Sequence, residues 1–350
     1  MESGIIGLPL SGKTTIFNSL TGQSAQTSDY AGGKKETNLA EIAVPDKRID
    51  ELTKIFKPKR TIYATVLVKD IAVEFTEQGG IAPSSMAEMR NSDVLTIVIR
   101  AFKDESVLHP LDKVDPLKDF IKVMESMIFS DYAICENRMA RLVKESKKDN
   151  NEYKILEKIR DILEEDKLPA QDLLHPDEAK IISNFGFLTL KPLIVIANTG
   201  EENTAIDSLE ARLKELGVTF FAIRGDSEME IAQLSAEDQV EFLKDLGLAE
   251  PAKNRYLQRV YENLNLISFM TVGEDEVRAW SVTKGSSAPQ AAGKIHSDLE
   301  KGFIRAEVIE SAAMLELGSM AEVKKNNKLR LEGKSYIVKD GDILNIRFNV

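Results

Sequence analysis

The most specific signal for the fold is Gly7-Leu8-Pro9-Leu10-Ser11-Gly12-Lys13-Thr14. It matches the pattern G-x-x-x-x-G-K-S/T, which is typical of a phosphate-binding loop. Residues 4–8 are apolar, as in a short buried strand, and residues 13–20 carry Ile, Phe and Leu at helical spacing. A strand, a glycine-containing turn and a helix in this order predict an α/β fold with a P-loop nucleotide-binding domain.

The residue types in this loop suit a nucleotide phosphate. Glycines let the backbone curl, so that its N–H groups and the N-terminus of the helix face the phosphates. Lys13 is expected to bridge the outer phosphates, which makes it a catalytic candidate, and the Thr14 hydroxyl is expected to bind magnesium. A glycine-containing turn without a function is the alternative, but it leaves the flanking strand and helix unexplained. The loop residues expected to contact ATP or GTP are Gly7, Leu8, Pro9, Leu10, Ser11, Gly12, Lys13, Thr14 and Thr15.

Other apolar segments predict the rest of the sheet. Residues 61–73, 93–102 and 191–197 are rich in β-branched side chains, and near-continuous apolar strands are typical of a parallel sheet covered on both faces. Asp70 follows the apolar residues 65–68, where P-loop NTPases place an aspartate that holds magnesium directly or through water. An ordinary turn aspartate is the alternative for this position.

A polar loop after a later strand is the candidate for base selection. Asn198-Thr199-Gly200-Glu201 follows the apolar residues 193–197, where GTPases carry Asn-Lys-x-Asp. There the Asp accepts two N–H groups of guanine and the Lys packs on the base. Here Thr199 replaces the Lys and the longer Glu201 replaces the Asp, which weakens guanine selection. A polar turn without a ligand is the alternative.

The middle of the chain predicts a helical insertion. Asp115-Pro116 is typical of a helix N-cap with proline in the first turn, and apolar residues at helical spacing follow as far as Ile128. A second, charged helix is expected at about 152–165. We therefore predict an antiparallel helix pair within residues 115–185.

The remaining chain returns to an α/β pattern and then changes. A helix at 205–216 and a strand at 218–223 restore the alternation. Short strands at 267–272 and 277–282, a helix near 288–299 and a hairpin over 336–348 that turns at Asp340-Gly341 predict a small α+β domain. The predicted boundaries are 1–114 and 186–264 for the two parts of the nucleotide-binding domain, 115–185 for the insertion and 265–350 for the last domain.

Composition limits the classes of partner. The 350 residues include 43% hydrophobic and 29% charged side chains, which excludes disordered and collagen-like classes. The net charge of −11 argues against a general electrostatic grip on nucleic acid, although basic clusters at 57–60, 138–148 and 324–330 could meet RNA. The lone Cys135 cannot form an internal disulfide and is expected in the core. No apolar run is long enough for a membrane helix, so we expect a cytoplasmic protein without a membrane partner.

Several of these motifs together resemble the YchF (Obg-like ATPase) family. The resemblance lies in Leu8-Pro9, in Val44-Pro45-Asp46, in Asp70-Ile71-Ala72 and in the Asn-x-x-Glu pattern of residues 198–201, and it covers essentially the whole chain. The C-terminal residues 276–281, 288–307 and 336–342 look like the TGS domain of that family.

The resemblance implies a Ras-like nucleotide domain, a helical insertion similar to a coiled coil and a β-grasp TGS domain. Members of the family hydrolyse ATP, commonly in preference to GTP, and associate with ribosomes or RNA. They lack the glutamine that positions water in Ras-like enzymes, and a histidine is proposed to serve instead. The matching residue is His109, for which an exposed loop histidine is the alternative.

The chain also departs from the family pattern. Leu10 stands where the family has an Asn that helps related proteins to hold potassium, and Val73 replaces a glycine whose N–H contacts the γ-phosphate. In the first switch, Thr37 is only a candidate for the magnesium hydroxyl. Arg224-Gly225 replaces the segment that backs the base, and both residues are expected at the nucleotide.

These observations together predict a P-loop NTPase that binds ATP or GTP with magnesium, hydrolyses ATP slowly and meets the ribosome or ribosomal RNA. A nucleotide-binding switch or adaptor with little turnover is the first alternative, because the switches are altered. A P-loop kinase is the second, although it leaves the TGS-like end unexplained. The sequence does not determine the oligomeric state.

Overall fold

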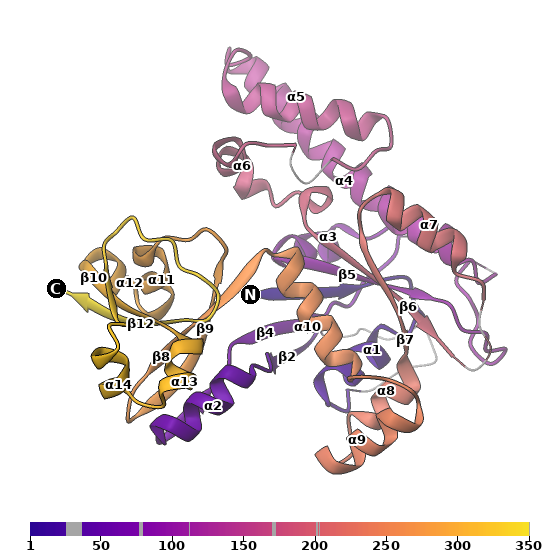
Figure 1. Ribbon diagram of the computed structural model, residues 1–350. Coiled ribbons are helices and arrows are strands. Elements are labelled where there is room, and N and C mark those ends of the chain that lie inside the picture. The colour runs from indigo at the N-terminus through magenta and orange to yellow at the C-terminus, as the bar shows by residue number, and fades with distance from the viewer. Residues whose placement is uncertain are drawn as a thin grey trace. The chain divides into compact units, whose positions relative to one another are not determined.

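A six-stranded sheet with four parallel strand pairs organises the first of two units in this computed structural model (Figure 1). The structure describes residues 1–25, 37–76, 80–111, 113–169, 173–200, 202 and 204–349. Unit 1 comprises Met1–Ile42 and Leu67–Val260, and unit 2 comprises Ala43–Val66 and Tyr261–Val350. Both units are built from segments that lie far apart in the chain.

The sheet of unit 1 has the strand order β2-β4-β1-β5-β6-β7. The pairs β1·β4, β1·β5, β5·β6 and β6·β7 are parallel. β5 is buried along its whole length, as its run of β-branched residues predicts. The strands are β1 (Glu2–Ile6), β2 (Asn38–Ala43), β4 (Thr65–Asp70), β5 (Val94–Arg100), β6 (Leu193–Thr199) and β7 (Thr219–Arg224).

Helices cover both faces of this sheet (Figure 1). On one face, α3, the first turns of α4 and α7 pack their apolar side chains onto β1, β5 and β6. On the other face, α10 reaches the sheet through Tyr256, whose hydroxyl bonds Ser3 and Thr96. The helices are α1 (Lys13–Thr21), α3 (Pro83–Arg90), α7 (Asp207–Glu215), α8 (Gly225–Ile231), α9 (Ala236–Asp245) and α10 (Ala252–Asn263).

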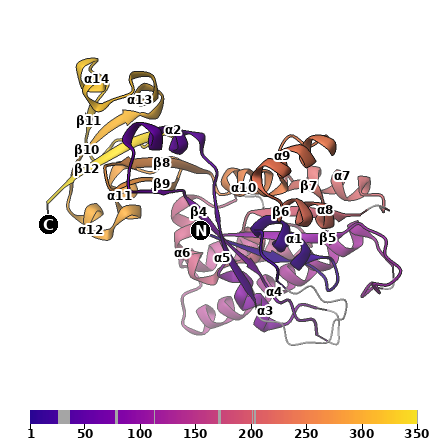
Figure 2. The same cartoon turned by 90° about the horizontal axis from the view of Figure 1, so that it is seen from below.

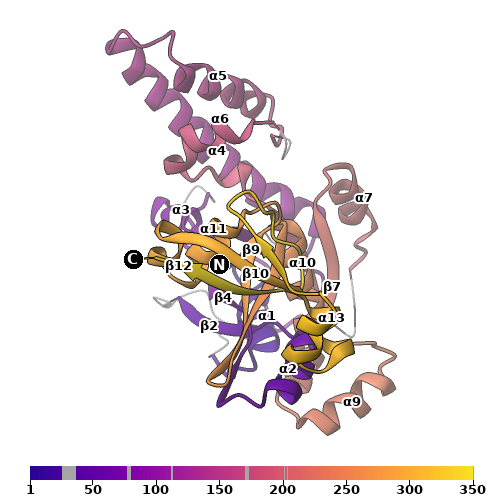
Figure 3. The ribbon, with the colours of Figure 1, turned by 60° about the vertical axis from the view of Figure 1, so that its left-hand side comes forward.

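The predicted helix pair is present. The helix α4 (Pro116–Lys144) is capped by Asp115, and α5 (Asn151–Glu164) is capped by Asn150. Figure 3 shows α4 and α5 side by side, with α6 (Pro176–Ile182) near them, and the three share one apolar core. The short helices η1 (Ser183–Phe185) and η2 (Leu188–Leu190) lead back to β6. Cys135 lies fully buried in this core, as expected.

Unit 2 is a mixed sheet with the order β11-β10-β12-β8-β9-β3. Figure 2 shows α11 and α12 on one face and α2, α13 and α14 on the other, in agreement with two separate apolar clusters. Its strands are β3 (Arg60–Ile62), β8 (Leu266–Val272), β9 (Glu276–Thr283), β10 (Phe303–Glu310), β11 (Arg330–Glu332) and β12 (Asp342–Phe348). Its helices are α2 (Lys47–Phe56), α11 (Ala288–Ile295), α12 (Ser297–Lys301), α13 (Ser311–Leu317) and α14 (Met320–Lys325).

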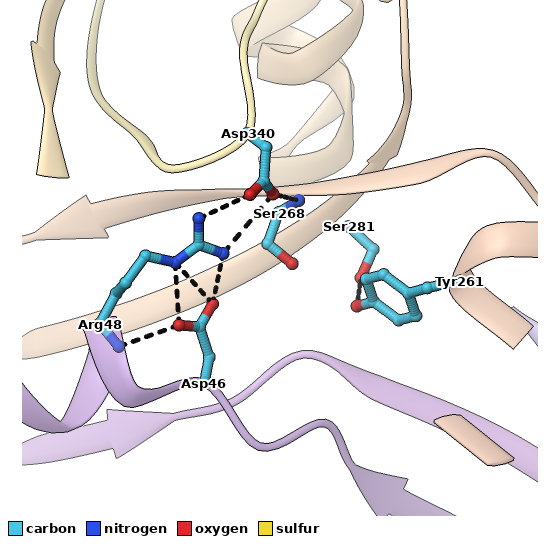
Figure 4. Close-up of polar contacts among 6 residues, drawn as sticks. All are labelled: Asp46, Arg48, Tyr261, Ser268, Ser281 and Asp340. Carbon is cyan, nitrogen blue, oxygen red and sulfur yellow. Dashed lines mark hydrogen bonds and ion pairs between the residues drawn. The ribbon is translucent and has the colours of Figure 1, made fainter. Parts of the chain in front are cut away.

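Unit 2 includes residues 43–66, which the sequence-based boundaries had placed in the nucleotide-binding domain. Figure 4 shows the reason: Arg48 lies between two carboxylates. Its Nε donates to Asp46 Oδ1 at 2.9 Å, and its Nη1 donates to Asp340 Oδ2 at 2.7 Å. Asp340 in turn accepts the backbone N–H of Ser268 at 2.9 Å. These bonds fasten the start of α2 to the turn before β12.

Three sequence-based expectations about elements were wrong. Residues 61–73 form two strands, not one, because β3 pairs with β9 in unit 2 whereas β4 pairs with β1 in unit 1. The helix near 288–299 breaks at His296, whose extended backbone ends α11 and whose imidazole caps α12. The hairpin over 336–348 does not form, since β12 pairs with β10 and β8, and Ile337 makes only an isolated bridge with Ser287.

In the part of the chain that the structure describes, no helix is long and apolar enough to cross a membrane.

Candidate functional site

The phosphate-binding loop lies between β1 and α1, at the carboxyl edge of the parallel sheet. Three of its residues have positive φ, namely Gly7 (151°), Leu10 (62°) and Gly12 (82°). A Cβ on Gly7 would meet the Val98 carbonyl at 2.3 Å, so this position requires glycine. The first helical hydrogen bond runs from Ile16 N to Gly12 O, and the N–H groups before it therefore face the end of the helix, where an anion would bind.

Lys13 folds back over the loop. Its Nζ donates to the carbonyl oxygens of Gly7 at 3.1 Å and Leu8 at 3.0 Å. Within the described residues, the buried Ser11 Oγ has no hydrogen-bond partner. An ammonium group and an unpartnered hydroxyl within one curled loop fit a ligand that brings several acceptor oxygens, as a phosphate does.

Thr14 and Asp70, the two residues expected to hold magnesium, lie within hydrogen-bond distance of each other. Thr14 Oγ1 donates to Asp70 Oδ2 at 2.8 Å, because β4 pairs with β1 and brings the end of the strand beside α1. Asn38 Nδ2 donates to the same carboxylate oxygen at 3.2 Å. Sequence reasoning considered Thr37 here and missed Asn38. Asn38 could have been found from its position, because it begins β2, the strand next to β4.

Asn198 bonds the backbone of two neighbouring loops. Its Nδ2 donates to Ser11 O at 3.1 Å, and its Oδ1 accepts from Gly225 N at 3.2 Å. A Cβ on Gly12 would lie 2.1 Å from Nδ2, and one on Gly225 would lie 2.5 Å from Oδ1. The buried carboxamide therefore joins the phosphate loop to the start of α8.

Of the other candidates for base recognition, the structure describes Thr199 and Arg224 but not Glu201. Thr199 Oγ1 donates to Ile223 O at 3.1 Å, and the exposed Arg224 ends β7 immediately before Gly225. Both therefore lie at the same edge of the sheet as the phosphate loop. Glu201 lies outside the described residues.

His109 is not the exposed loop histidine that its position in the sequence also allows. Its side chain is only 4% exposed, and its Nε2 lies 2.8 Å from Asp119 Oδ2 on α4. The backbone N–H of Leu111 donates to its Nδ1 at 3.1 Å. Both ring nitrogens are thus bonded within the protein.

The loop that carries His109 starts at a buried arginine. Arg100, the last residue of β5, donates to the carbonyl oxygens of Phe102, Asp104 and Val107. Burial lowers the pKa of Arg100, and the nearby Asp104 opposes this shift. The guanidinium therefore shapes residues 102–107, and sequence reasoning missed it. The signal was an arginine at the end of an otherwise apolar strand.

Phe102, in this loop, lies beside the phosphate loop and the 198–202 loop. A Cβ on Gly200 would lie 3.0 Å from Phe102 Cβ, and one on Gly12 would lie 3.9 Å from the Phe102 ring. The backbone N–H of Lys103 donates to Glu202 O at 3.0 Å. The phosphate loop, the 198–202 loop and the His109 loop are therefore neighbours, and together they form a site that can bind a phosphorylated ligand.

Family models match two parts of the chain. Residues 2–138 match the model described as 50S ribosome-binding GTPase. Residues 266–349 match the C-terminal model of YchF GTPases, which is described as a protein of unknown function (DUF933).

Curated relatives match over the full length. The ribosome-binding ATPase YchF of Haemophilus influenzae is 38% identical over 360 residues, which cover 100% of this chain and 99% of that protein. The protein of the same name from Bacillus subtilis is 36% identical over 365 residues, covering 100% of both. The solved structure of the Schizosaccharomyces pombe YchF GTPase matches with a TM-score of 0.86 and 29% identity, covering 99% of this chain and 97% of that one. The expected P-loop domain, helical insertion and C-terminal domain are thus confirmed.

Proposed function

Since this chain belongs to the YchF family, we propose that it is a magnesium-dependent P-loop NTPase that hydrolyses ATP slowly, binds ATP at least as well as GTP and associates with the ribosome. The observation that carries the proposal is the phosphate loop, with positive φ at Gly7 and Gly12, a lysine folded over its carbonyl groups and an unpartnered Ser11 hydroxyl. Each of these features suits a polyphosphate.

Lys13 carries the electrostatic part of the reaction. On binding, its ammonium group exchanges two loop carbonyl oxygens for the outer phosphate oxygens. The backbone N–H groups at the start of α1 hold the remaining charge. These donors are fixed before the reaction, so they stabilise the charge that develops as water attacks the γ-phosphorus and ADP leaves.

The residues at Asp70 fit a magnesium ion. A hydroxyl and a carboxylate, both hard oxygen donors, lie 2.8 Å apart at Thr14 and Asp70. Among the described residues no group of three or more His, Cys, Asp or Glu side chains could hold a metal alone. Two protein oxygens, with phosphate oxygens and water completing the shell, suit magnesium better than a site made only of protein ligands. When bound, this ion would neutralise charge on the phosphates.

Base selection follows from the 198–201 loop. Thr199 offers no long apolar stem to pack on a base, and Glu201 is one methylene longer than the Asp that selects guanine. Asn198 bonds Ser11 and Gly225, so its carboxamide assembles the site. Contacts from Thr199, Glu201, Arg224 and Gly225 would therefore accept adenine at least as well as guanine.

His109 is proposed to order the attacking water, in the place of a glutamine. A neutral imidazole can accept a proton from water or hydrogen-bond it. In this structure both ring nitrogens are bonded to other groups. That observation favours a second candidate function, a nucleotide-binding switch or adaptor with little turnover.

The proposed association with the ribosome is supported by the names of the relatives and by exposed basic residues. A cytoplasmic location is part of the same proposal. Ion pairs occupy part of each basic cluster: Lys59 bonds Asp275, and Arg138 bonds Glu152. Arg141 and Lys144, on the exposed side of α4, remain the strongest candidates for contacts with RNA phosphates.

Single-turnover hydrolysis with magnesium tests the proposal. Purified protein in excess over labelled ATP or GTP should form diphosphate, with ATP turned over at least as fast as GTP. Lys13→Ala is the matched control and should abolish nucleotide binding without changing the circular dichroism spectrum. Binding of ATP without any hydrolysis would establish the adaptor instead, and a clear preference for GTP would refute the reading of the base loop. Co-sedimentation with ribosomes, with and without ATP, tests the partner.

A further inference from the structure

The His109 imidazole is held by a buried carboxylate, that of Asp119, to which the proposed reaction assigns no role. His109 and Asp119 have side chains that are 4% and 2% exposed, with 2.8 Å between Nε2 and Oδ2. The N–H of Leu111 donates to Nδ1. A histidine has two ring nitrogens, so none is left to bond a water at the γ-phosphate. His109 cannot order that water while these two bonds last.

The surroundings of Asp119 both stabilise its hydrogen bond to His109 and allow that bond to break. Burial raises the pKa of the Asp119 carboxyl, while the hydrogen bond from His109 opposes this shift. Asp115 and Arg100 are the other charged groups that act on Asp119, with opposite signs. Within the described residues, Asp119 Oδ1 has no hydrogen-bond partner. A buried carboxylate oxygen without a partner loses its hydration, and it would regain water if the loop moved away.

The loop that carries His109 is also held at its other end, next to the phosphate loop. Arg100 bonds three carbonyl groups between Phe102 and Val107, and Phe102 lies beside the phosphate loop. Leu108 follows with 81% of its surface exposed. His109 is therefore the first buried side chain after the part of the loop that Arg100 holds, and Asp119 is its bond to α4.

We propose that Asp119 is a positioning residue that withholds His109 from the nucleotide, and that this hydrogen bond must open before His109 can order the attacking water. The inference rests on the proposed function, because it assumes that His109 acts at the phosphate. Asp119 belongs to the same helix that extends into the helical insertion, so a displacement of α4 would break the same bond.

Nuclear magnetic resonance of labelled histidine tests directly whether Asp119 keeps His109 away from the nucleotide. The chain has only three histidines, and His175 and His296 have side chains that are 73% and 65% exposed, so they serve as internal controls. Without nucleotide, the His109 signals should show an unprotonated Nδ1 and an Nε2 proton that exchanges slowly with water. A non-hydrolysable ATP analogue with magnesium should shift these signals and speed the exchange. His109 signals that the analogue leaves unchanged would overturn the proposal.

Hydrolysis rates test the consequence. Asp119→Asn keeps the shape of the side chain and removes its charge, so the pair should open more often. A hydrogen bond to a charged group is worth a factor of about 10 to 100, and single-turnover hydrolysis should rise by about that factor with unchanged ATP affinity. Glu125→Gln, which changes an exposed carboxylate on the same helix, should match the wild type. The double variant His109→Ala/Asp119→Asn should be as slow as His109→Ala.

The outcomes separate this inference from the proposed function. If the Asp119→Asn variant hydrolyses ATP as slowly as the His109→Ala variant, Asp119 supports catalysis directly. That result would overturn the proposal that Asp119 withholds His109. If Asp119→Asn does not fold, the resonance experiment on the wild type decides. If no protein hydrolyses ATP although all bind it, the proposed function fails, and the resonance of His109 still decides whether Asp119 holds it and nucleotide releases it.

Discussion

Asn198→Ala should loosen the phosphate loop from the edge of the sheet. The side chain is buried, and it bonds Ser11 O at 3.1 Å and Gly225 N at 3.2 Å. Alanine would leave both backbone groups without a partner, and each buried polar group left unpaired costs about 1–3 kcal/mol. A water can enter the polar space that the carboxamide leaves. The two losses together would cost about 2–6 kcal/mol. Because a water would offset part of this cost, we expect the free energy of unfolding to fall by about 2–4 kcal/mol.

Urea denaturation followed by circular dichroism measures this loss. With a slope of about 3 kcal/mol per molar, the midpoint should fall by about 1 M. ATP affinity, measured by calorimetry, should fall about tenfold, because binding must then order a loop residue that the wild type holds in place, at a cost of about 1–2 kcal/mol.

Tyr256→Phe is the matched control. It removes hydrogen bonds to Ser3 and Thr96 from a buried hydroxyl of the same unit, away from the phosphate loop. It should lower stability and leave ATP affinity unchanged. An Asn198→Ala protein with wild-type stability and wild-type affinity would refute the reasoning, since the two hydrogen bonds would then contribute neither to the fold nor to the preorganisation of the loop.

Three other predictions concern single features. Leu10 offers no side-chain oxygen to potassium, so exchanging sodium for potassium should leave the hydrolysis rate unchanged, and strong activation by potassium would contradict this. Glu201→Asp combined with Thr199→Lys should move the ratio of ATP to GTP affinity toward GTP, as competition binding can measure. Burial raises the pKa of the Cys135 thiol to about 12, so a thiol reagent should label this single cysteine at pH 8 only as fast as the helical insertion opens. Labelling at the rate of a free thiol would show that the side chain is exposed.

Local sequence signals were sufficient for the phosphate loop and the buried strands. The loop needs positive φ at Gly7 and Gly12, and these glycines stand in the sequence at the required spacing. β5 is apolar along its length because helices cover both faces of the sheet. In such segments the constraint on each residue comes from its own backbone or from burial, and both are visible in one sequence.

The partner of a strand is not visible in the same way. The segment 61–73 reads as one apolar run, yet Arg60–Ile62 pairs with β9 and Thr65–Asp70 pairs with β1. Arg48 explains part of this, since its bonds to Asp46 and Asp340 fasten α2 to a turn almost 300 residues away in the sequence. Hydrophobic periodicity predicts that a strand is buried, but pairing across such a separation depends on contacts that periodicity does not encode.

Asn198 and His109 show the same limit at the site itself. Asn198 was predicted at the nucleotide because it follows a strand where GTPases carry Asn-Lys-x-Asp, and His109 because of the resemblance to the YchF family. Asn198 lies beside the phosphate loop, and both ends of its carboxamide bond the backbone of neighbouring loops. In His109 both nitrogens are likewise bonded, to Asp119 and to Leu111. A polar side chain has few hydrogen-bonding positions, and loops that converge at a site compete for them with the ligand. Under the proposed function, Asn198 would therefore serve the ligand by fixing the loop that binds it, whereas His109 could serve it only after giving up a bond.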